Sequence, residues 1–284
     1  MQIGKISKAL QKAQKERQKR KGIRVDKIPK SSVNSFNADL GTFDKLTPKT
    51  SIDTTKVSKA LHAFHDQHSY ITEEYRIMRT NINTLHKKSD LQTLLISSSI
   101  ASEGKTVTSL NYAYTLACDK TKRVVVIDCD LRKGTLSRYF AYAPDEFRGV
   151  TDVLMGFASL ADVVVSSGRP NCDIIFRGNA IDHPVEALDS KPMHQMLQEL
   201  RKHYDYIILD APPILPVTDA CVLASQVDGM LLVIKMGKTP KATVQQSLDM
   251  LKKIDVNLIG TVLTNVEYVT PGYGKYYYTY GEKK

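Results

Sequence analysis

An apolar strand that runs directly into a loop of small residues places the strongest constraint on how this chain can fold. Residues 93–106 read TLLISSSIASEGKT, so the loop closes on Gly-Lys-Thr. In phosphate-binding loops of this kind, backbone N–H groups and the N-terminus of the following helix surround the phosphates, while the lysine reaches the outer phosphates and the hydroxyl faces Mg²⁺. The segment predicts a nucleoside triphosphate site with these contact residues: Ser102, Glu103, Gly104, Lys105, Thr106 and Val107.

The loop departs from the usual G-x-x-x-x-G-K-[ST] pattern, because Ser99 stands at the first glycine position. Taken alone, it could be a chance run of small residues. Two later segments argue against chance, since residues 123–132 read RVVVIDCDLR and residues 204–213 read YDYIILDAPP. Each is a buried-type apolar strand that ends in aspartate, and the carboxyl edge of a parallel sheet is where open α/β folds bind ligands.

The aspartates at these two strand ends are Asp128, Asp130 and Asp210. Carboxylates at this edge can hold Mg²⁺ directly or through its waters, since this small cation needs only one or two protein oxygens. A strand-end aspartate can equally cap a helix or a turn. The loop and the two acidic strand ends follow one another in order, which favours a metal-assisted phosphate site over isolated caps.

Composition limits the chain to one large folded domain. With 284 residues, 42% of them apolar, it can bury a single α/β core but not two full catalytic domains. No apolar run reaches the roughly 18 residues that cross a bilayer, and the N-terminus lacks the apolar region of a signal peptide. The four cysteines form no C-x-x-C pair, which indicates neither zinc nor disulfides. We expect a cytoplasmic protein.

Most of the formal net charge of +10 lies near the N-terminus, where residues 1–30 contain eleven Lys and Arg against two acids. Apolar residues recur at helical spacing, so this segment can be a basic amphipathic helix that docks on a partner or on anionic lipid; it can also be a solvated tail. It has no aromatic residue to stack on bases, and nucleic acid is not expected as a partner. Residues 31–69 are polar without apolar periodicity and are predicted to be a flexible linker.

The folded domain is predicted over residues 70–268. Short Val, Ile and Leu runs without polar alternation are separated there by helical segments, which is typical of a parallel sheet covered on both faces. The expected fold class is α/β and P-loop NTPase-like, with a mostly parallel sheet flanked by helices on both faces. We expect strands over 93–97, 123–127, 173–176, 205–209, 230–234 and 258–263, and helices over 106–118, 159–167, 191–202 and 241–254.

Residues 269–284 are crowded with tyrosine and read VTPGYGKYYYTYGEKK. Glycine and proline surround the tyrosines at the end of the chain, where packing is hard to maintain, so we expect exposed phenols. They can accept phosphate, which adds close to two negative charges per group. A stacked aromatic patch or a binding surface is the alternative. The candidate acceptors are Tyr273, Tyr276, Tyr277, Tyr278 and Tyr280.

Together, these segments resemble the bacterial tyrosine autokinases (BY-kinases) of exopolysaccharide and capsule biosynthesis, over roughly residues 70–284. SSSIASEGKT is similar to the family's Walker A motif, VVVIDCDLR to its Walker A′ motif and IILDAPP to its Walker B motif, while the terminal tyrosines resemble its autophosphorylation cluster. Glu73, Arg76 and Arg79 match its E-x-x-R-x-x-R element, which contacts the neighbouring subunit of a ring. On the residues alone, these charges could be a solvated helix face.

The resemblance implies an ATP-dependent protein-tyrosine kinase that phosphorylates the tail of a neighbouring copy and regulates polymerisation and export of the polysaccharide. It implies ATP and Mg²⁺ as cofactors. It also implies that Asp128 orients or deprotonates the incoming tyrosine, and that the metal is held by Thr106, Asp130 and Asp210. The implied catalytic residues are Lys105, Asp128, Asp130 and Asp210.

Two further residues have two interpretations each. Arg132 can contact phosphate or pair with a carboxylate, and Asn265 resembles an adenine-reading position but can be a turn residue. The loop also departs from the family pattern, because Ala101 replaces a proline and Ser102 a glycine. Ser102 tolerates positive φ less well than glycine, which weakens the inference about loop geometry but leaves Lys105 and Thr106 unaffected.

The resemblance also implies partners. These are a homo-oligomeric ring, a cognate tyrosine phosphatase, and a separate membrane protein that regulates chain length and activates the kinase. The basic segment 1–30 is a plausible docking element that would recruit the protein to the inner face of the cell membrane.

Two other functions are compatible with the loop. A switch ATPase that positions septa or partitions plasmids would carry a lysine where Ile100 stands, and would leave the tyrosine-rich tail unexplained. An ATP-sensing scaffold of a polysaccharide export complex would not need an intact set of Lys105 and aspartates.

Overall fold

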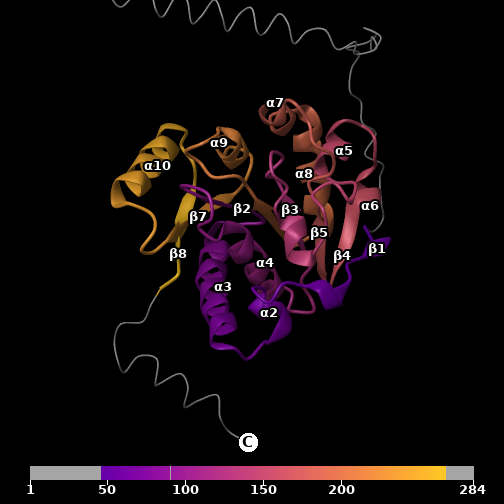
Figure 1. The fold of residues 1–284 in the computed structure, drawn as a ribbon, viewed down its shortest axis with the longest axis horizontal. Helices are drawn as coiled ribbons and strands as arrows, with labels where there is room; N and C mark the ends of the chain where they lie inside the picture. Colours follow the sequence, from indigo (N-terminus) through magenta and orange to yellow (C-terminus); the bar gives the residue numbers. More distant parts are fainter. Residues whose placement is uncertain (1–45, 90, 267–284) are drawn as a thin grey trace, which may run out of the picture. The chain divides into compact units, whose positions relative to one another are not determined.

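An eight-stranded sheet forms the centre of the folded domain, in the order β1-β4-β5-β3-β6-β2-β7-β8 (Figure 1). The computed structural model describes residues 46–89 and 91–266, so the basic segment 1–30 and the tail 269–284 lie outside the described residues. Neighbouring strands are parallel except for β4 and β5, which are antiparallel. The predicted α/β fold with a mostly parallel sheet is confirmed.

The six strands predicted from apolar runs are all present, and their ends agree with the predicted ends within one residue. Two strands, β1 and β4, were not predicted. The strands are β1 Thr50–Ser51, β2 Thr93–Ser98, β3 Val124–Asp128, β4 Val164–Arg169, β5 Cys172–Ile175, β6 Tyr206–Asp210, β7 Gly229–Lys235 and β8 Leu258–Thr264.

The helix predicted over residues 159–167 is wrong in its second half. The helical signal is real at its start, where the Asp162 carboxylate accepts from the Ser159 backbone N–H at 3.2 Å and caps a single turn. The β-branched residues that follow suit a strand better, and Val165 lies opposite Ile174 in an antiparallel pair with β5. Helix α6 (Leu160–Val163) therefore passes directly into β4.

Three predicted helices are confirmed with small shifts of their ends: α4 (Lys105–Leu116), α8 (Lys191–His203) and α10 (Lys241–Lys253). Among the helices of the described residues, none combines the length and the apolar character needed to cross a bilayer. The remaining helices are α2 His62–His65, α3 Tyr70–Ser89, α5 Val150–Leu154, α7 Pro184–Leu188 and α9 Asp219–Ala224, with short 3₁₀ turns η2 Thr54–Lys56 and η3 Leu136–Phe140.

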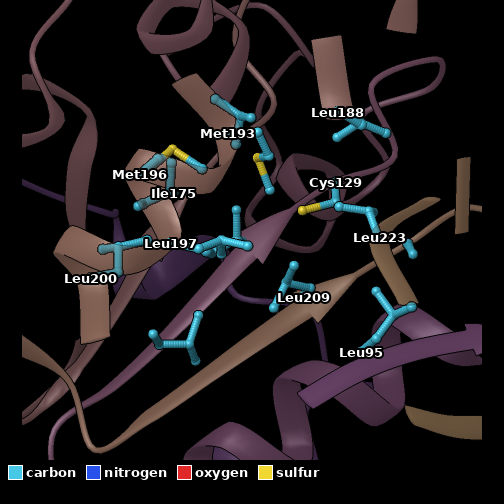
Figure 2. Packing of buried hydrophobic residues seen from close by; sticks show 14 of the residues in the cluster. Leu95, Cys129, Ile175, Leu188, Met193, Met196, Leu197, Leu200, Leu209 and Leu223 are labelled. Atoms are coloured by element: carbon cyan, nitrogen blue, oxygen red, sulfur yellow. The ribbon is translucent and has the colours of Figure 1, made fainter. Parts of the chain in front are cut away.

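Helices cover both faces of the sheet, as Figure 1 shows for α2, α3 and α4 on one side and α7, α8 and α9 on the other. Side chains of β3 alternate between the two faces, because successive strand residues point in opposite directions. Val125 and Ile127 pack into the cluster beneath α8 and α9, whereas Val124 and Val126 pack into the cluster beneath α3 and α4. Figure 2 shows the first cluster, in which α8 contributes Met193, Met196, Leu197 and Leu200.

The segment before α3 belongs to the fold, so the prediction of a linker is wrong over residues 46–69. Leu46 and Leu61 are fully buried and Ile52 nearly so. The Ile52 N–H donates to the Ser166 carbonyl at 3.0 Å, beside the parallel pair of β1 and β4. The apolar residues here are few and irregularly spaced among polar ones, which is why the sequence shows no periodicity although most of them are buried in the core.

Replacing Leu61 with alanine tests this assignment. The buried side chain packs with the α3–α4 cluster, so we expect Leu61→Ala to lower the free energy of unfolding by about 2–5 kcal/mol. Urea unfolding measures the change, and Lys59→Ala, at an exposed neighbouring position, serves as the control. Equal stabilities of the two variants would contradict the assignment.

Candidate active site

The loop between β2 and α4 needs two residues with left-handed backbone. Gly104 has φ +96° and Ser102 has φ +65°, a region that glycine adopts without strain and serine does not favour. The loop therefore keeps the expected geometry despite its serine. Because the first N–H groups of a helix have no acceptor within it, those at the start of α4 are available for phosphate. Val107 lies in this first turn.

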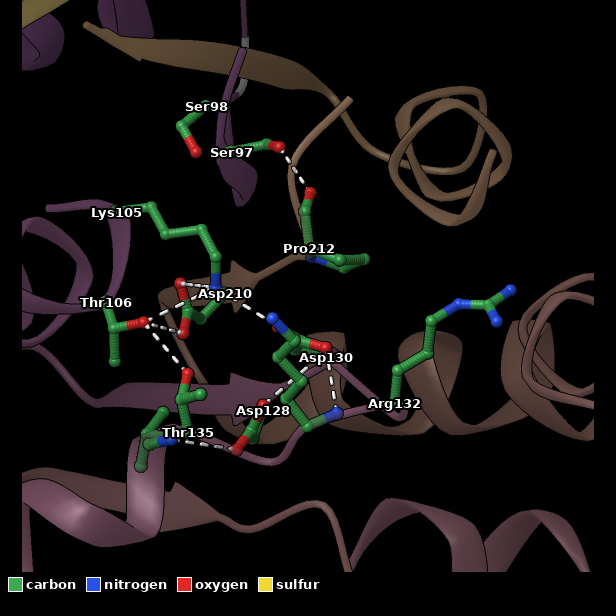
Figure 3. A network of polar contacts seen from close by, with 12 residues as sticks. Ser97, Ser98, Lys105, Thr106, Asp128, Asp130, Arg132, Thr135, Asp210 and Pro212 are labelled. Atoms are coloured by element: carbon green, nitrogen blue, oxygen red, sulfur yellow. Dashed lines mark hydrogen bonds and ion pairs between the residues drawn. The ribbon is translucent and has the colours of Figure 1, made fainter. Parts of the chain in front are cut away.

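Lys105 lies at the centre of a polar cluster, where its ammonium is 3.6 Å from Asp130 and 3.6 Å from Asp210 (Figure 3). The Thr106 hydroxyl donates to Asp210 at 2.7 Å, and Ser109 donates to the other oxygen of that carboxylate at 3.3 Å. Burial alone would lower the pKa of Lys105, but the surrounding carboxylates raise it above its usual value. The lysine is therefore held in its charged form.

Asp130 keeps a small exposed fraction, whereas Asp210 has none and neither has Asp128. The carboxylate oxygens of Asp128 accept from the backbone N–H groups of Asp130 and Leu136 at 3.1 Å each. Asp128 and Asp210 are register partners on neighbouring parallel strands, which brings two carboxylates together. Burial, reinforced by the charge of Asp210, raises the pKa of Asp128 to about 8. Burial also raises the pKa of Asp210, while Lys105 and the Thr106 hydroxyl oppose that shift.

A cavity of about 380 Å³ opens over this cluster. Lys105, Thr106 and Asp130 line it, whereas Asp128 and Asp210 do not. Sequence reasoning missed part of its wall, because most of those residues come from the segment interpreted as a linker and from loops without a recognisable motif; Pro213 ends the segment similar to Walker B but was not assigned a role. The missed lining residues are Ser58, Lys133, Thr135, Arg138, Tyr139 and Pro213.

The side chain of Glu103 does not line the cavity, so contact of this residue with the nucleotide through its backbone stays a prediction. Its carboxylate is fully buried and accepts from the N–H of Ile100 at 2.7 Å, from the N–H of Lys235 at 3.3 Å and from the Thr239 hydroxyl. The Thr264 hydroxyl donates to its carbonyl at 2.7 Å. Glu103 thus connects the phosphate loop to the ends of β7 and β8.

Arg132 is turned away from the cluster in Figure 3 and forms a forked ion pair with the buried Asp219. Its Nε and Nη2 each lie 3.0 Å from a carboxylate oxygen. Of the two interpretations, the structure shows the carboxylate pair, and contact with phosphate stays a prediction. Asn265 has φ +58° and directs its Nδ2 to the Met236 carbonyl at 3.4 Å, which fits a turn; contact with adenine stays a prediction.

The predicted interface residues lie on α3, and each has a partner within this chain. Arg76 pairs with Glu73 at 3.0 Å, while Arg79 donates to the Thr115 carbonyl at 2.5 Å and so caps the end of α4. Glu73 and Arg76 remain partly exposed, and their contact with a neighbouring subunit stays a prediction.

The residues of the site fit a nucleotide with a hard cation. In the described part of the chain, no group of three or more His, Cys, Asp or Glu forms a metal-binding cluster. Two carboxylates and a hydroxyl suffice for Mg²⁺, which draws its other oxygens from water and phosphates. The Ser99 hydroxyl is buried in the loop without a hydrogen-bond partner among the described residues. A ligand in the loop would give such a group a partner.

The fold and this site define a nucleotide-binding protein of the P-loop class. Residues 91–262 match the family described as AAA domain. The chain is 32% identical to the tyrosine-protein kinase YwqD of Bacillus subtilis (strain 168) over 209 residues, which are 74% of this chain and 87% of that protein. It is 31% identical to the tyrosine-protein kinase ptk of Acinetobacter johnsonii over 71% of this chain, but over only 27% of that longer protein.

Among solved structures, the kinase domain of the Escherichia coli tyrosine kinase ETK superposes with a TM-score of 0.67 at 28% identity, covering 76% of this chain and 84% of that one. The chain belongs to the bacterial tyrosine kinases (BY-kinases). It is thus a protein-tyrosine kinase. The two alternatives that the sequence left open, a switch ATPase and an ATP-sensing scaffold, fit these comparisons less well.

The buried position of Asp128 predicts a pH-dependent cost to stability. A raised pKa leaves the carboxyl protonated in the folded chain up to about pH 8, whereas the unfolded chain ionises near pH 4. The stabilisation of the folded chain that comes from this pKa difference is thus complete below pH 4, and it is lost as pH rises towards 8. With a chelator present, we expect the stability of Asp128→Asn relative to the unmodified chain to rise by roughly 2 kcal/mol between pH 5 and 7.

Urea unfolding at both pH values measures this difference. Asp255→Asn, at an exposed position whose positive φ asparagine also accepts, is the matched control. A constant difference for Asp128→Asn would show that Asp128 ionises normally.

Proposed function

We propose that this kinase transfers the γ-phosphoryl group of ATP to tyrosines in residues 269–284 of a neighbouring copy, and that it thereby regulates polymerisation and export of an exopolysaccharide or capsule. The observation that supports this proposal is the position of Lys105. This residue lines the cavity, and its ammonium lies 3.6 Å from Asp130 and 3.6 Å from Asp210. Phosphoryl transfer depends mainly on position and neutralisation of charge, and this arrangement supplies both.

Each residue of the cluster has a role in this proposal. Lys105 neutralises charge on the outer phosphates, together with the N–H groups of the loop. Bound Mg²⁺ supplies further neutralisation of the phosphates. Thr106, Asp130 and Asp210 hold this ion through their oxygens, and the hydrogen bond between Thr106 and Asp210 already sets the hydroxyl beside the carboxylate.

We assign proton removal from the incoming tyrosine to Asp128. Once ionised, a carboxylate with a pKa of about 8 accepts a proton from a phenol more readily than an ordinary aspartate does. The side chain does not line the cavity, and its carboxylate accepts hydrogen bonds from the N–H groups of Asp130 and Leu136. A phenol therefore reaches it only when the segment between these two residues shifts. Thr135 belongs to this segment, and its hydroxyl lies 3.4 Å from that of Thr106. In this proposal, nucleotide that binds at Thr106 causes the shift.

The proposal includes three kinds of partner. Copies of the chain assemble into a ring through α3, with Glu73, Arg76 and Arg79 at the interface. A separate membrane protein that regulates chain length activates the kinase and brings it from the cytoplasm to the inner face of the membrane, and a tyrosine phosphatase reverses the modification. The long Acinetobacter relative supports the second partner, because there a similar domain is one part of a larger chain.

Mass spectrometry of the chain after incubation with ATP and Mg²⁺ tests the activity. We expect phosphate on residues 273–280, and a loss of at least about 100-fold in Lys105→Met, because the variant lacks the cation that stabilises the transferred group. A candidate membrane activator is supplied in a parallel sample. ATP hydrolysis without phosphotyrosine in both samples would contradict the kinase proposal.

Deletion of residues 1–30 tests the membrane partner. The segment carries eleven cations, so we expect the deletion to reduce sedimentation with vesicles that contain anionic lipid and the activator, and to reduce activation by the same partner. A second variant replaces the eleven cations with glutamine and keeps the length. Unchanged recruitment and activation in both variants would show that docking lies elsewhere.

A further inference from the structure

One wall of the cavity carries two cations that the phosphate chemistry above does not use. Lys133 and Arg138 line the cavity, and both are exposed. In the described ranges 46–89 and 91–266, no carboxylate lies within ion-pair distance of either side chain. This differs from Lys105, which has two carboxylate partners, and from Arg132, which has one.

The part of the wall that carries Arg138 is anchored to the rest of the fold. The Leu136 N–H donates to Asp128 at 3.1 Å, and the Tyr139 carbonyl accepts from the Ser58 N–H at 2.7 Å. Leu136 and Phe140 are fully buried on either side of Arg138. Arg138 is therefore presented to the cavity by an anchored turn, and Lys133 lies on the segment that leads into this turn; the phosphate loop lines the same cavity.

We propose that Lys133 and Arg138 form an anion-binding rim that recognises a phosphotyrosine next to the acceptor tyrosine, so that tails already phosphorylated once are the preferred substrate. Arginine binds phosphate through paired, charge-assisted hydrogen bonds, and lysine adds a point charge. The inference rests on the proposed function, since it concerns the substrate of the same cavity.

The sequence of the tail explains why the rim selects a modified substrate. Between Tyr273 and Tyr280 the only charged residue is Lys275, so the unmodified acceptor segment offers no anion and is repelled by two cations. Each phosphate adds close to two negative charges. Tyr276, Tyr278 and Tyr280 are each two residues apart, so in an extended chain they would share one side at a spacing of about 7 Å. A first phosphate thus lies beside the next acceptor.

The first phosphorylation is then slow, and the following ones are faster. Partly modified tails would be rare during the reaction, and the chain would pass from unmodified to multiply modified forms. The rim makes modification of the tail nearly all-or-none without a second active site.

Peptide binding tests the rim without relying on catalysis. The full chain is prepared with phenylalanine at its five candidate acceptors, and no nucleotide is added. Fluorescence anisotropy then compares labelled peptides of residues 269–284 with and without phosphate on Tyr278. We expect the phosphopeptide to bind about tenfold more tightly, and the preference to disappear in the double variant Lys133→Ala, Arg138→Ala. Lys253→Ala, at an exposed site on α10, should keep the preference.

Two further arms keep the test decisive. The charge-conserving double variant Lys133→Arg, Arg138→Lys should retain the preference, which separates charge from folding of the turn. A non-hydrolysable ATP analogue with Mg²⁺ should leave phosphopeptide binding in place; displacement would show that the peptide phosphate occupies the phosphate loop instead. Equal affinity for the two peptides, or a preference that survives in the alanine variant, would overturn the proposal.

A time course of phosphorylation by mass spectrometry completes the test on the chain with its native tail. We expect the second phosphate to appear about tenfold faster than the first, and the ratio of these rates to approach one in the alanine variant. A ratio that stays the same in this variant would overturn the rim. If no phosphate is transferred at all, the proposed function fails, whereas the peptide experiment still decides whether the rim exists.

Discussion

The site depends on a single buried ammonium held among carboxylates. Lys105 faces Asp130 and Asp210, and Asp128 lies just below them, so acidic groups outnumber the cation that they surround. Such an excess of negative charge in a low-dielectric interior is unfavourable, and it is relieved when a carboxyl takes up a proton or a cation enters. The raised pKa of Asp128 shows the first of these two routes.

The strand order of the sheet brings these like charges together. Because β3 and β6 are neighbouring parallel strands, their last residues Asp128 and Asp210 are register partners, while β2 on the other side of β6 delivers the phosphate loop to the same edge. The apolar residues that precede each aspartate fill both faces of the sheet. The packing energy of the core thus holds like charges close together in a place where they would otherwise separate.

Sequence alone was sufficient wherever the signal was local. Apolar runs located six strands because a buried parallel strand needs them, and the loop and its aspartates were recognised from spacing. What it could not show were contacts between distant residues. The buried Glu103 contacts Lys235 and Thr239, and Arg132 pairs with Asp219; nothing near either residue in the sequence reveals these partners. The depth of Asp128 was equally hidden, because it depends on where the following turn folds back.

The burial of residues 46–61 has a practical meaning for any shortened version of this kinase. A fragment that began at residue 70, where the strongest sequence pattern begins, would lack Ser58 and its bond to the Tyr139 carbonyl. It would also expose to water the apolar surface that Ile52 and Leu61 now cover. Such a fragment would keep every nucleotide motif but lose a support of the wall that faces the acceptor. A kinase shortened in this way would keep its nucleotide site but hold the acceptor tyrosine less firmly.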